Sequence, residues 1–87
     1  MEKIYIIQKQ HNGYANIHKK AFIYKEDAKR VQSEIVEEIA RAYEEMYGMD
    51  HTYVQKDIDI VTVTTDLVKD ENWIVRIVEV ETEMEAL

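Results

Sequence analysis

The sequence contains no cysteine and no proline, and its 87 residues include only two glycines. Without cysteine, the chain can form neither a disulfide nor a thiolate metal site, and nothing in it points to an oxidising compartment. No stretch approaches the roughly 18 consecutive apolar residues that a membrane-spanning helix needs. We therefore expect a cytoplasmic protein without a membrane partner.

The usual sequence signatures of catalysis are also missing. There is no glycine-rich phosphate-binding motif, and the only serine, Ser33, falls inside a predicted helix. His11, His18 and His51 each stand alone, without the spacing of a metal site. We therefore expect a protein that is not an enzyme and that holds no metal and no cofactor.

Size and composition predict one folded domain over 1–87. Hydrophobic residues make up 46% of the chain and charged residues 33%, which is too apolar a composition for a disordered chain. A domain of this size buries only about 60 to 65% of the surface that its unfolded chain exposes. A dimer interface would therefore reinforce it.

The two glycines divide the chain into its elements. The Asn12-Gly13 pair favours a tight turn between two segments rich in β-forming residues, which predicts a hairpin over 3–24. Gly48 follows a long helical pattern and predicts the end of a helix over 26–47. After the helix we expect a loop over 48–57, a second hairpin over 58–82 and an acidic tail over 83–87.

The predicted fold class is α+β, a single domain of order β-β-α-β-β. Both pairs of strands are close enough in sequence to form hairpins, so an antiparallel sheet with the long helix packed on one face is the simplest arrangement. The sequence does not determine the order of the strands in that sheet.

The predicted helix carries two apolar stripes. The stripe that we expect to pack on the sheet consists of Ala28, Val31, Ile35, Ile39, Ala42 and Met46. The second stripe consists of Val36, Ala40, Tyr43 and Tyr47. One sheet needs only about a 100° stripe, so the second needs another cover: a loop, a second copy of the chain or a different protein. We predict a symmetric dimer through the second stripe.

Charge is distributed unevenly along the chain. The first thirty residues hold seven basic side chains against three acidic ones, whereas the remainder holds four against fifteen, for a net charge of −7. Such asymmetry determines the sign of the field that a partner meets. Alternating glutamates near the C-terminus form either a solvated edge or a mimic of nucleic-acid phosphate. The candidate acidic surface consists of Glu37, Glu38, Glu44, Glu45, Glu79, Glu81 and Glu83.

The N-terminal hairpin supplies the opposite charge. Its candidate anion-binding residues are Lys9, His18, Lys19 and Lys20, near the aromatic ring of Tyr14. The net charge of the whole chain would repel duplex nucleic acid, and we do not expect duplex as a partner. The net negative charge repels a nucleotide or other compact anion less, because such an anion contacts only the basic residues of the hairpin.

Three segments carry a resemblance to a group of proteins. They are Lys3-Ile4-Tyr5-Ile6-Ile7, then Ala21-Phe22-Ile23-Tyr24-Lys25-Glu26-Asp27-Ala28, and finally Trp73-Ile74-Val75-Arg76-Ile77. This pattern resembles small proteins of bacteriophage and prophage genomes, which share a short first strand, a hairpin, a Phe-x-x-Lys-Glu-x-Ala helix start and a closing strand. One departure is the absence of the Ser or Thr often found at that helix start, which predicts a weak N-cap.

Some small acidic phage proteins inhibit host enzymes or defence systems. The resemblance therefore implies an inhibitor in the cytoplasm of a bacterial host. Together with the acidic surplus, it favours a non-enzymatic viral interaction protein that binds a host nucleic-acid-handling or anti-phage defence protein through a basic surface on that partner. The alternative is a small nucleotide-binding or anion-binding protein that uses the basic hairpin.

Overall fold

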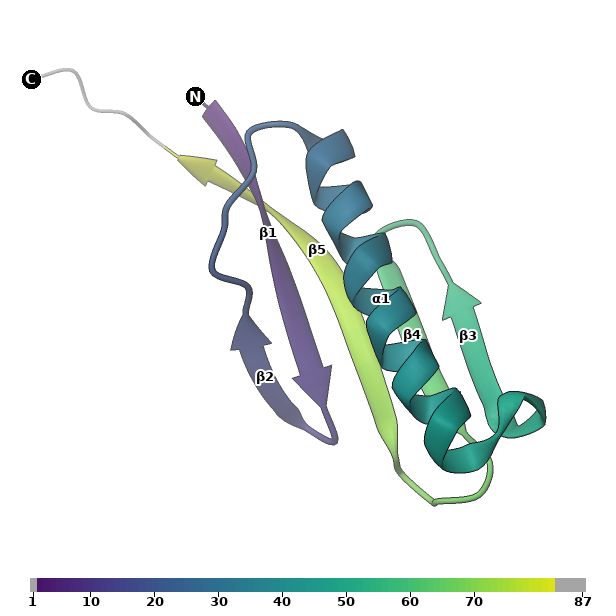
Figure 1. Cartoon of the computed structure of the whole chain (residues 1–87). Helices are drawn as coiled ribbons and strands as arrows, with labels where there is room; N and C mark the ends of the chain where they lie inside the picture. The colour runs from purple at the N-terminus through teal and green to yellow at the C-terminus, as the bar shows by residue number, and fades with distance from the viewer. Residues whose placement is uncertain (1, 83–87) are drawn as a thin grey trace, which may run out of the picture.

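The computed structural model describes residues 2–82 and shows a five-stranded antiparallel sheet with one long helix across one face (Figure 1). This confirms the predicted α+β class. The elements are β1 (Glu2–His11), β2 (Tyr14–Ile17), α1 (Lys25–Tyr47), the 3-10 helix η1 (Met49–His51), β3 (Thr52–Lys56), β4 (Ile60–Thr65) and β5 (Asn72–Thr82). The predicted acidic tail, which includes Glu83, lies outside the described residues.

The sheet has the order β2-β1-β5-β4-β3, so β1 and β5 pair near its centre. Their ladder runs from Glu2 opposite Thr82 to His11 opposite Trp73. β1 and β2 are joined by the predicted tight turn, in which Gly13 has a φ of 94°. This turn conformation suits glycine because glycine has no Cβ to clash at positive φ.

The predicted loop over 48–57 is wrong in its second half, because Thr52–Lys56 forms strand β3. β3 pairs with β4 on one side only and is the edge of the sheet. The residues of β3 are mostly exposed, as is common for an edge strand. Its polar residues Gln55 and Lys56 made this segment look like a loop in the sequence.

The helix ends where the sequence predicts. Gly48 has a φ of 92°, and its backbone N–H donates a hydrogen bond of 2.9 Å to the Glu44 carbonyl oxygen. At the other end, the N-cap residue Tyr24 makes no side-chain cap hydrogen bond. Glu26 and Asp27 in the first turn oppose the positive end of the helix dipole.

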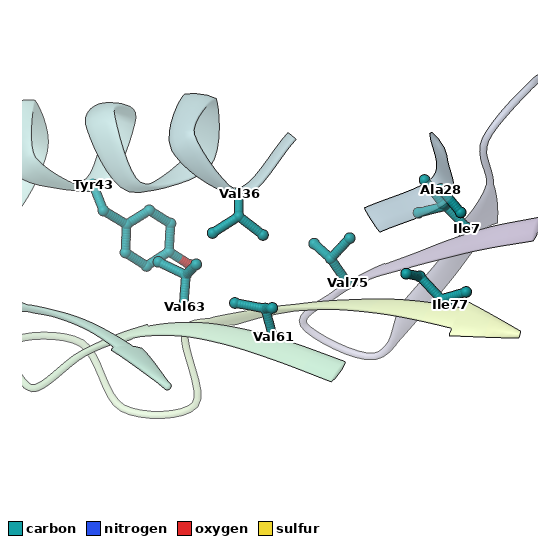
Figure 2. Packing of buried hydrophobic residues seen from close by; sticks show 8 residues of the cluster. All are labelled: Ile7, Ala28, Val36, Tyr43, Val61, Val63, Val75 and Ile77. Carbon is teal, nitrogen blue, oxygen red and sulfur yellow. The ribbon is translucent and has the colours of Figure 1, made fainter. Parts of the chain in front are cut away.

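The core lies between α1 and the central strands (Figure 2). Its buried hydrophobic residues are Ile7, Ala28, Val36, Tyr43, Val61, Val63, Val75 and Ile77. Val36 and Tyr43 belong to the stripe predicted to mediate a dimer, and only 6% and 2% of their surfaces are exposed within the single chain. Val36 and Tyr43 are therefore covered by the chain's own sheet and are not free to meet a second copy, whereas Ala40 and Tyr47 of the same stripe are only partly buried.

The helix is rotated about its axis relative to the prediction. Its buried centre includes Gln32, a polar residue that lies between the two predicted apolar stripes, about 40° from both Ala28 and Val36 around the helix axis. Met46 of the predicted sheet-facing stripe is 66% exposed. Gln32 is accepted in the core because its side-chain amide donates to two backbone carbonyls, those of Asp59 at 3.1 Å and Val75 at 2.9 Å. Sequence periodicity does not reveal that hydrogen-bonding opportunity.

Candidate functional site

The outward face of α1 is acidic from Glu34 to Glu45. It carries five exposed glutamates and one exposed arginine: Glu34, Glu37, Glu38, Glu44, Glu45 and Arg41. The ion pairs found among residues 2–82 involve none of these side chains. We call this surface the acidic helix face, and its charge is available to a partner.

The glutamates of β5 are placed differently. Glu79 forms an ion pair with Lys3 across the β1–β5 ladder, with 3.8 Å between the Lys3 Nζ and a carboxylate oxygen. Glu81 lies opposite Lys3 in the register of the same ladder. Lys3 therefore offsets part of the charge of this glutamate row.

The two groups of candidate acidic residues lie at different ends of the molecule. Ala28 of α1 and Ile77 of β5 lie at the same end of the core (Figure 2). From there, α1 carries Glu37 and Glu45 about 14 and 26 Å away along its axis, whereas β5 continues to Glu79 in the opposite direction. The structure thus separates the helix glutamates from Glu79 and Glu81.

A hollow of about 310 Å³ adjoins the acidic helix face. It is lined by His11, Glu38, Ile39, Ala42, Tyr43, Met46, Glu71 and Trp73. The helix contributes an apolar wall and the Glu38 carboxylate, β1 and β5 contribute two aromatic rings, and the β4–β5 turn contributes Glu71. We call this site the His11–Glu71 hollow.

Glu71 is held in this hollow by residues of the first hairpin. Its carboxylate accepts hydrogen bonds from His11 Nε2, at 3.1 Å, and from the Asn12 side-chain amide. The His11 ring stacks on the Trp73 indole, with ring centroids 4.4 Å apart and 6° between the planes. Burial alone would raise the pKa of Glu71, but the hydrogen bonds from His11 and Asn12 outweigh it and lower that pKa below its ordinary value.

Tyr43 brings a hydroxyl group to the same place. Among residues 2–82, no group makes a hydrogen bond with this buried hydroxyl. Burial raises the pKa of Tyr43, and the nearby Glu71 carboxylate raises it further. The hydroxyl therefore stays protonated and can donate a hydrogen bond.

A second hollow, of about 580 Å³, lies on the other side of α1, above β3 and β4. It is lined by Ser33, Val36, Glu37, Ala40, Val54, Lys56 and Val61. Its charged groups are one carboxylate and one ammonium, which leaves it nearly neutral.

The predicted anion-binding residues line neither hollow. Lys9 points to the helix side of β1, His18 stacks on Phe22 with centroids 6.2 Å apart, and Lys19 and Lys20 are exposed between β2 and α1. The structure therefore gathers these four side chains in neither hollow. Within residues 2–82, no three histidine or carboxylate side chains gather at a spacing that could hold a metal ion.

The His11–Glu71 hollow is not apparent from sequence patterns. His11 stands alone among its sequence neighbours, and Glu71 lies 60 positions away. The available signals were the single tryptophan, Trp73, directly after the acidic turn, and His11 directly before the Asn-Gly turn. Only the β1–β5 register brings these two positions together.

Comparison with known proteins found no matching family model, curated protein or solved structure. In residues 2–82, none of the helices combines the length and hydrophobicity needed to cross a membrane.

Proposed function

We propose that the protein is a non-enzymatic interaction protein that binds a basic surface of another protein through the acidic helix face. The observation that carries this proposal is the absence of ion pairs for the glutamates of that face within the described chain. The acidic helix face carries five carboxylates against the single cation Arg41, so its net field toward solvent is negative and attracts a cationic surface.

The His11–Glu71 hollow supplies a binding place for one lysine or arginine side chain of that partner. Glu38 and Glu71 are acceptors for an ammonium or guanidinium group, and Tyr43 lies beside them. Ile39 and Met46 provide apolar contact for the aliphatic stem of the bound side chain. An arginine anchored in a partly enclosed pocket is a common source of binding energy at protein interfaces.

The biological role that best suits such a surface is inhibition of a nucleic-acid-handling or defence protein of a bacterial host by a phage-type protein. The basic groove of such a partner normally receives phosphate groups, and the helix carboxylates would occupy it instead. This role is supported by the acidic surplus and by the resemblance of the sequence pattern to small phage proteins.

The test begins with capture of the partner from the native host, followed by titration of the purified pair. Replacing Glu37, Glu38, Glu44 and Glu45 by glutamine removes four charges while preserving side-chain size. We expect at least about a tenfold loss of affinity and a smaller dependence of association rate on salt. The matched control replaces Glu79 and Glu81 by glutamine, which should have little effect. Equal binding by wild type and the helix variant across a salt series would exclude this function.

The alternative is capture of a nucleotide or another compact anion by Lys9, His18, Lys19 and Lys20. Exposed Lys19 and Lys20 form no ion pair within residues 2–82, which supports this alternative, but they line neither hollow. Calorimetric titration with ATP, repeated on the Lys19→Ala/Lys20→Ala variant, tests it directly. Binding that disappears in the variant would favour this alternative over the acidic interface.

A further inference from the structure

The face of the sheet opposite α1 is left open by the described chain. All five strands lie in one sheet, α1 crosses one side of it, and η1 is adjacent to the helix (Figure 1). No other helix or strand exists within residues 2–82 to cover the second side. We call that second side the open face.

The register identifies the residues of the open face. Ile7 and Ile77 are opposite each other and buried under the helix, so their neighbours Ile6 and Val78 point to the other side. The same alternation assigns to the open face the apolar residues Ile4, Ile6, Ala15, Ile17, Tyr53, Ile60, Ile74, Val78 and Val80. None of these residues belongs to the core or packs against it.

The open face is also poor in charge. Between the aliphatic residues lie the amides and hydroxyls Gln8, Gln10, Gln55, Thr62, Thr64, Asn72 and Thr82. The strand residues on this side include only two charged side chains, Arg76 near the middle and Glu2 at one end. One third of the whole chain is charged, so this face has the depletion of charge that marks the centre of protein interfaces.

The chemistry of the open face is complementary to itself. In a symmetric dimer, each patch meets its own copy, so its polar groups must be able to pair with identical groups. Amides and hydroxyls both donate and accept hydrogen bonds and satisfy this condition, whereas a patch of carboxylates would not. Arg76 already lies beside Gln8 of the same chain, with 3.4 Å between its Nη1 and the Gln8 Oε1.

The size of the open face also suits a dimer. The five strands are about 14 to 37 Å long and spaced about 4.8 Å apart, and together they present roughly 600 Å² of projected area. Side-chain relief increases the accessible area, which approaches the about 800 Å² per partner of a standard interface. Burial of this area would reinforce a domain whose single core is small.

We infer that two copies of this chain associate through their open faces, with the two sheets packed face to face. The two helices then lie on the outer sides of a four-layer dimer, and both acidic helix faces stay exposed to solvent. This inference does not rest on the proposed function, because it concerns the opposite side of the molecule.

Analytical ultracentrifugation at about 100 µM, where an interface with a micromolar Kd is saturated, should give the mass of a dimer. Ile6→Glu introduces a charge among the apolar residues of the open face, where Ile6 lies opposite Val78, and should weaken dimerisation by more than about tenfold. Ile23→Glu is the matched control, because Ile23 is 73% exposed and precedes α1 outside the open face. Arg76→Leu should tighten the dimer, since it removes a charge that the interface would bury.

A second measurement does not depend on the stability of these variants. The chain has no cysteine of its own, so a single engineered cysteine carries a spin label at one defined position. The label-to-label distance in the dimer should be shorter for Thr62→Cys, on the open face, than for Ser33→Cys, on the helix. A monomeric wild type, a dimer that Ile6→Glu leaves intact, or a shorter distance between Ser33 labels would each overturn the inference.

Discussion

Gln32 and Val75 are joined by a hydrogen bond of 2.9 Å, from the Gln32 side-chain amide to the Val75 carbonyl oxygen. The same amide nitrogen donates to the Asp59 carbonyl oxygen, so one side chain connects α1 to β5 and to the start of β4. Only 6% of the Gln32 surface is exposed. The helix is thus held by a directional contact as well as by non-directional apolar packing.

Replacing Gln32 should therefore destabilise the fold, and by more for Gln32→Glu than for Gln32→Leu. Gln32→Leu keeps most of the volume but removes both donors, and we expect the free energy of unfolding to fall by about 1 to 3 kcal/mol. Gln32→Glu should be worse at neutral pH, because a carboxylate would face two carbonyl oxygens. Urea denaturation measures both variants, and Glu34→Gln on the exposed helix surface is the control. A Gln32→Leu protein as stable as wild type would show that the two hydrogen bonds contribute nothing beyond packing.

Removing the buried hydroxyl of Tyr43, in contrast, should not destabilise the fold. Tyr43→Phe keeps the ring and removes a buried hydroxyl whose one neighbouring acceptor is the Glu71 carboxylate and which makes no hydrogen bond of good geometry within residues 2–82. Thermal unfolding should show equal or greater stability, within about 1 kcal/mol. Tyr47→Phe provides a comparison at the neighbouring ring, which packs edge-on against Tyr43 with centroids 5.5 Å apart. A loss well beyond 1 kcal/mol for Tyr43→Phe would mean that the hydroxyl has a partner after all.

The lowered pKa of Glu71 predicts that the stability of the fold depends on pH. Its pKa in the folded chain lies below the ordinary value of 4.5, so the ionised carboxylate stabilises the fold at neutral pH. This contribution should be complete above about pH 4.5 and should disappear as the pH falls through the lower folded-state pKa. The stability difference between wild type and Glu71→Gln, from urea midpoints, should therefore be present above about pH 4.5 and shrink as the pH falls below that value. Glu45→Gln, at an exposed site, should show no such trend, and a constant difference for Glu71→Gln would contradict the assignment.

Local signals predicted the elements that depend on local chemistry. Asn12-Gly13 predicted the first turn and Gly48 predicted the helix end, because asparagine and glycine adopt the positive φ angles found there more readily than other residues. The long helix and the hairpin partners of β1 and β5 followed from periodicity. The class of the fold could therefore be derived from the sequence.

Features that depend on distant residues could not be derived. The side of α1 that faces the sheet includes Gln32, whose carbonyl partners lie on β5 and before β4. The His11–Glu71 hollow depends on strand order, which sequence reasoning left undetermined. One signal of the open face was local, because the apolar residues of Ile4–Ile7 in β1 and Trp73–Val75 in β5 are consecutive and must therefore lie on both faces of the sheet.

The position of β5 has a consequence for how the chain folds during synthesis. β5 is the strand that joins the β1–β2 hairpin to the β3–β4 hairpin, and its Thr82 bonds Glu2 across 80 positions of sequence. At about 5 to 20 residues per second, a ribosome needs about 3 to 12 s to add the 60 positions between Asn12 and Asn72. During that interval two separate hairpins and a helix can form, but the sheet cannot. A product terminated before Asn72 would therefore have no strand to unite its halves and would be a substrate for proteolysis.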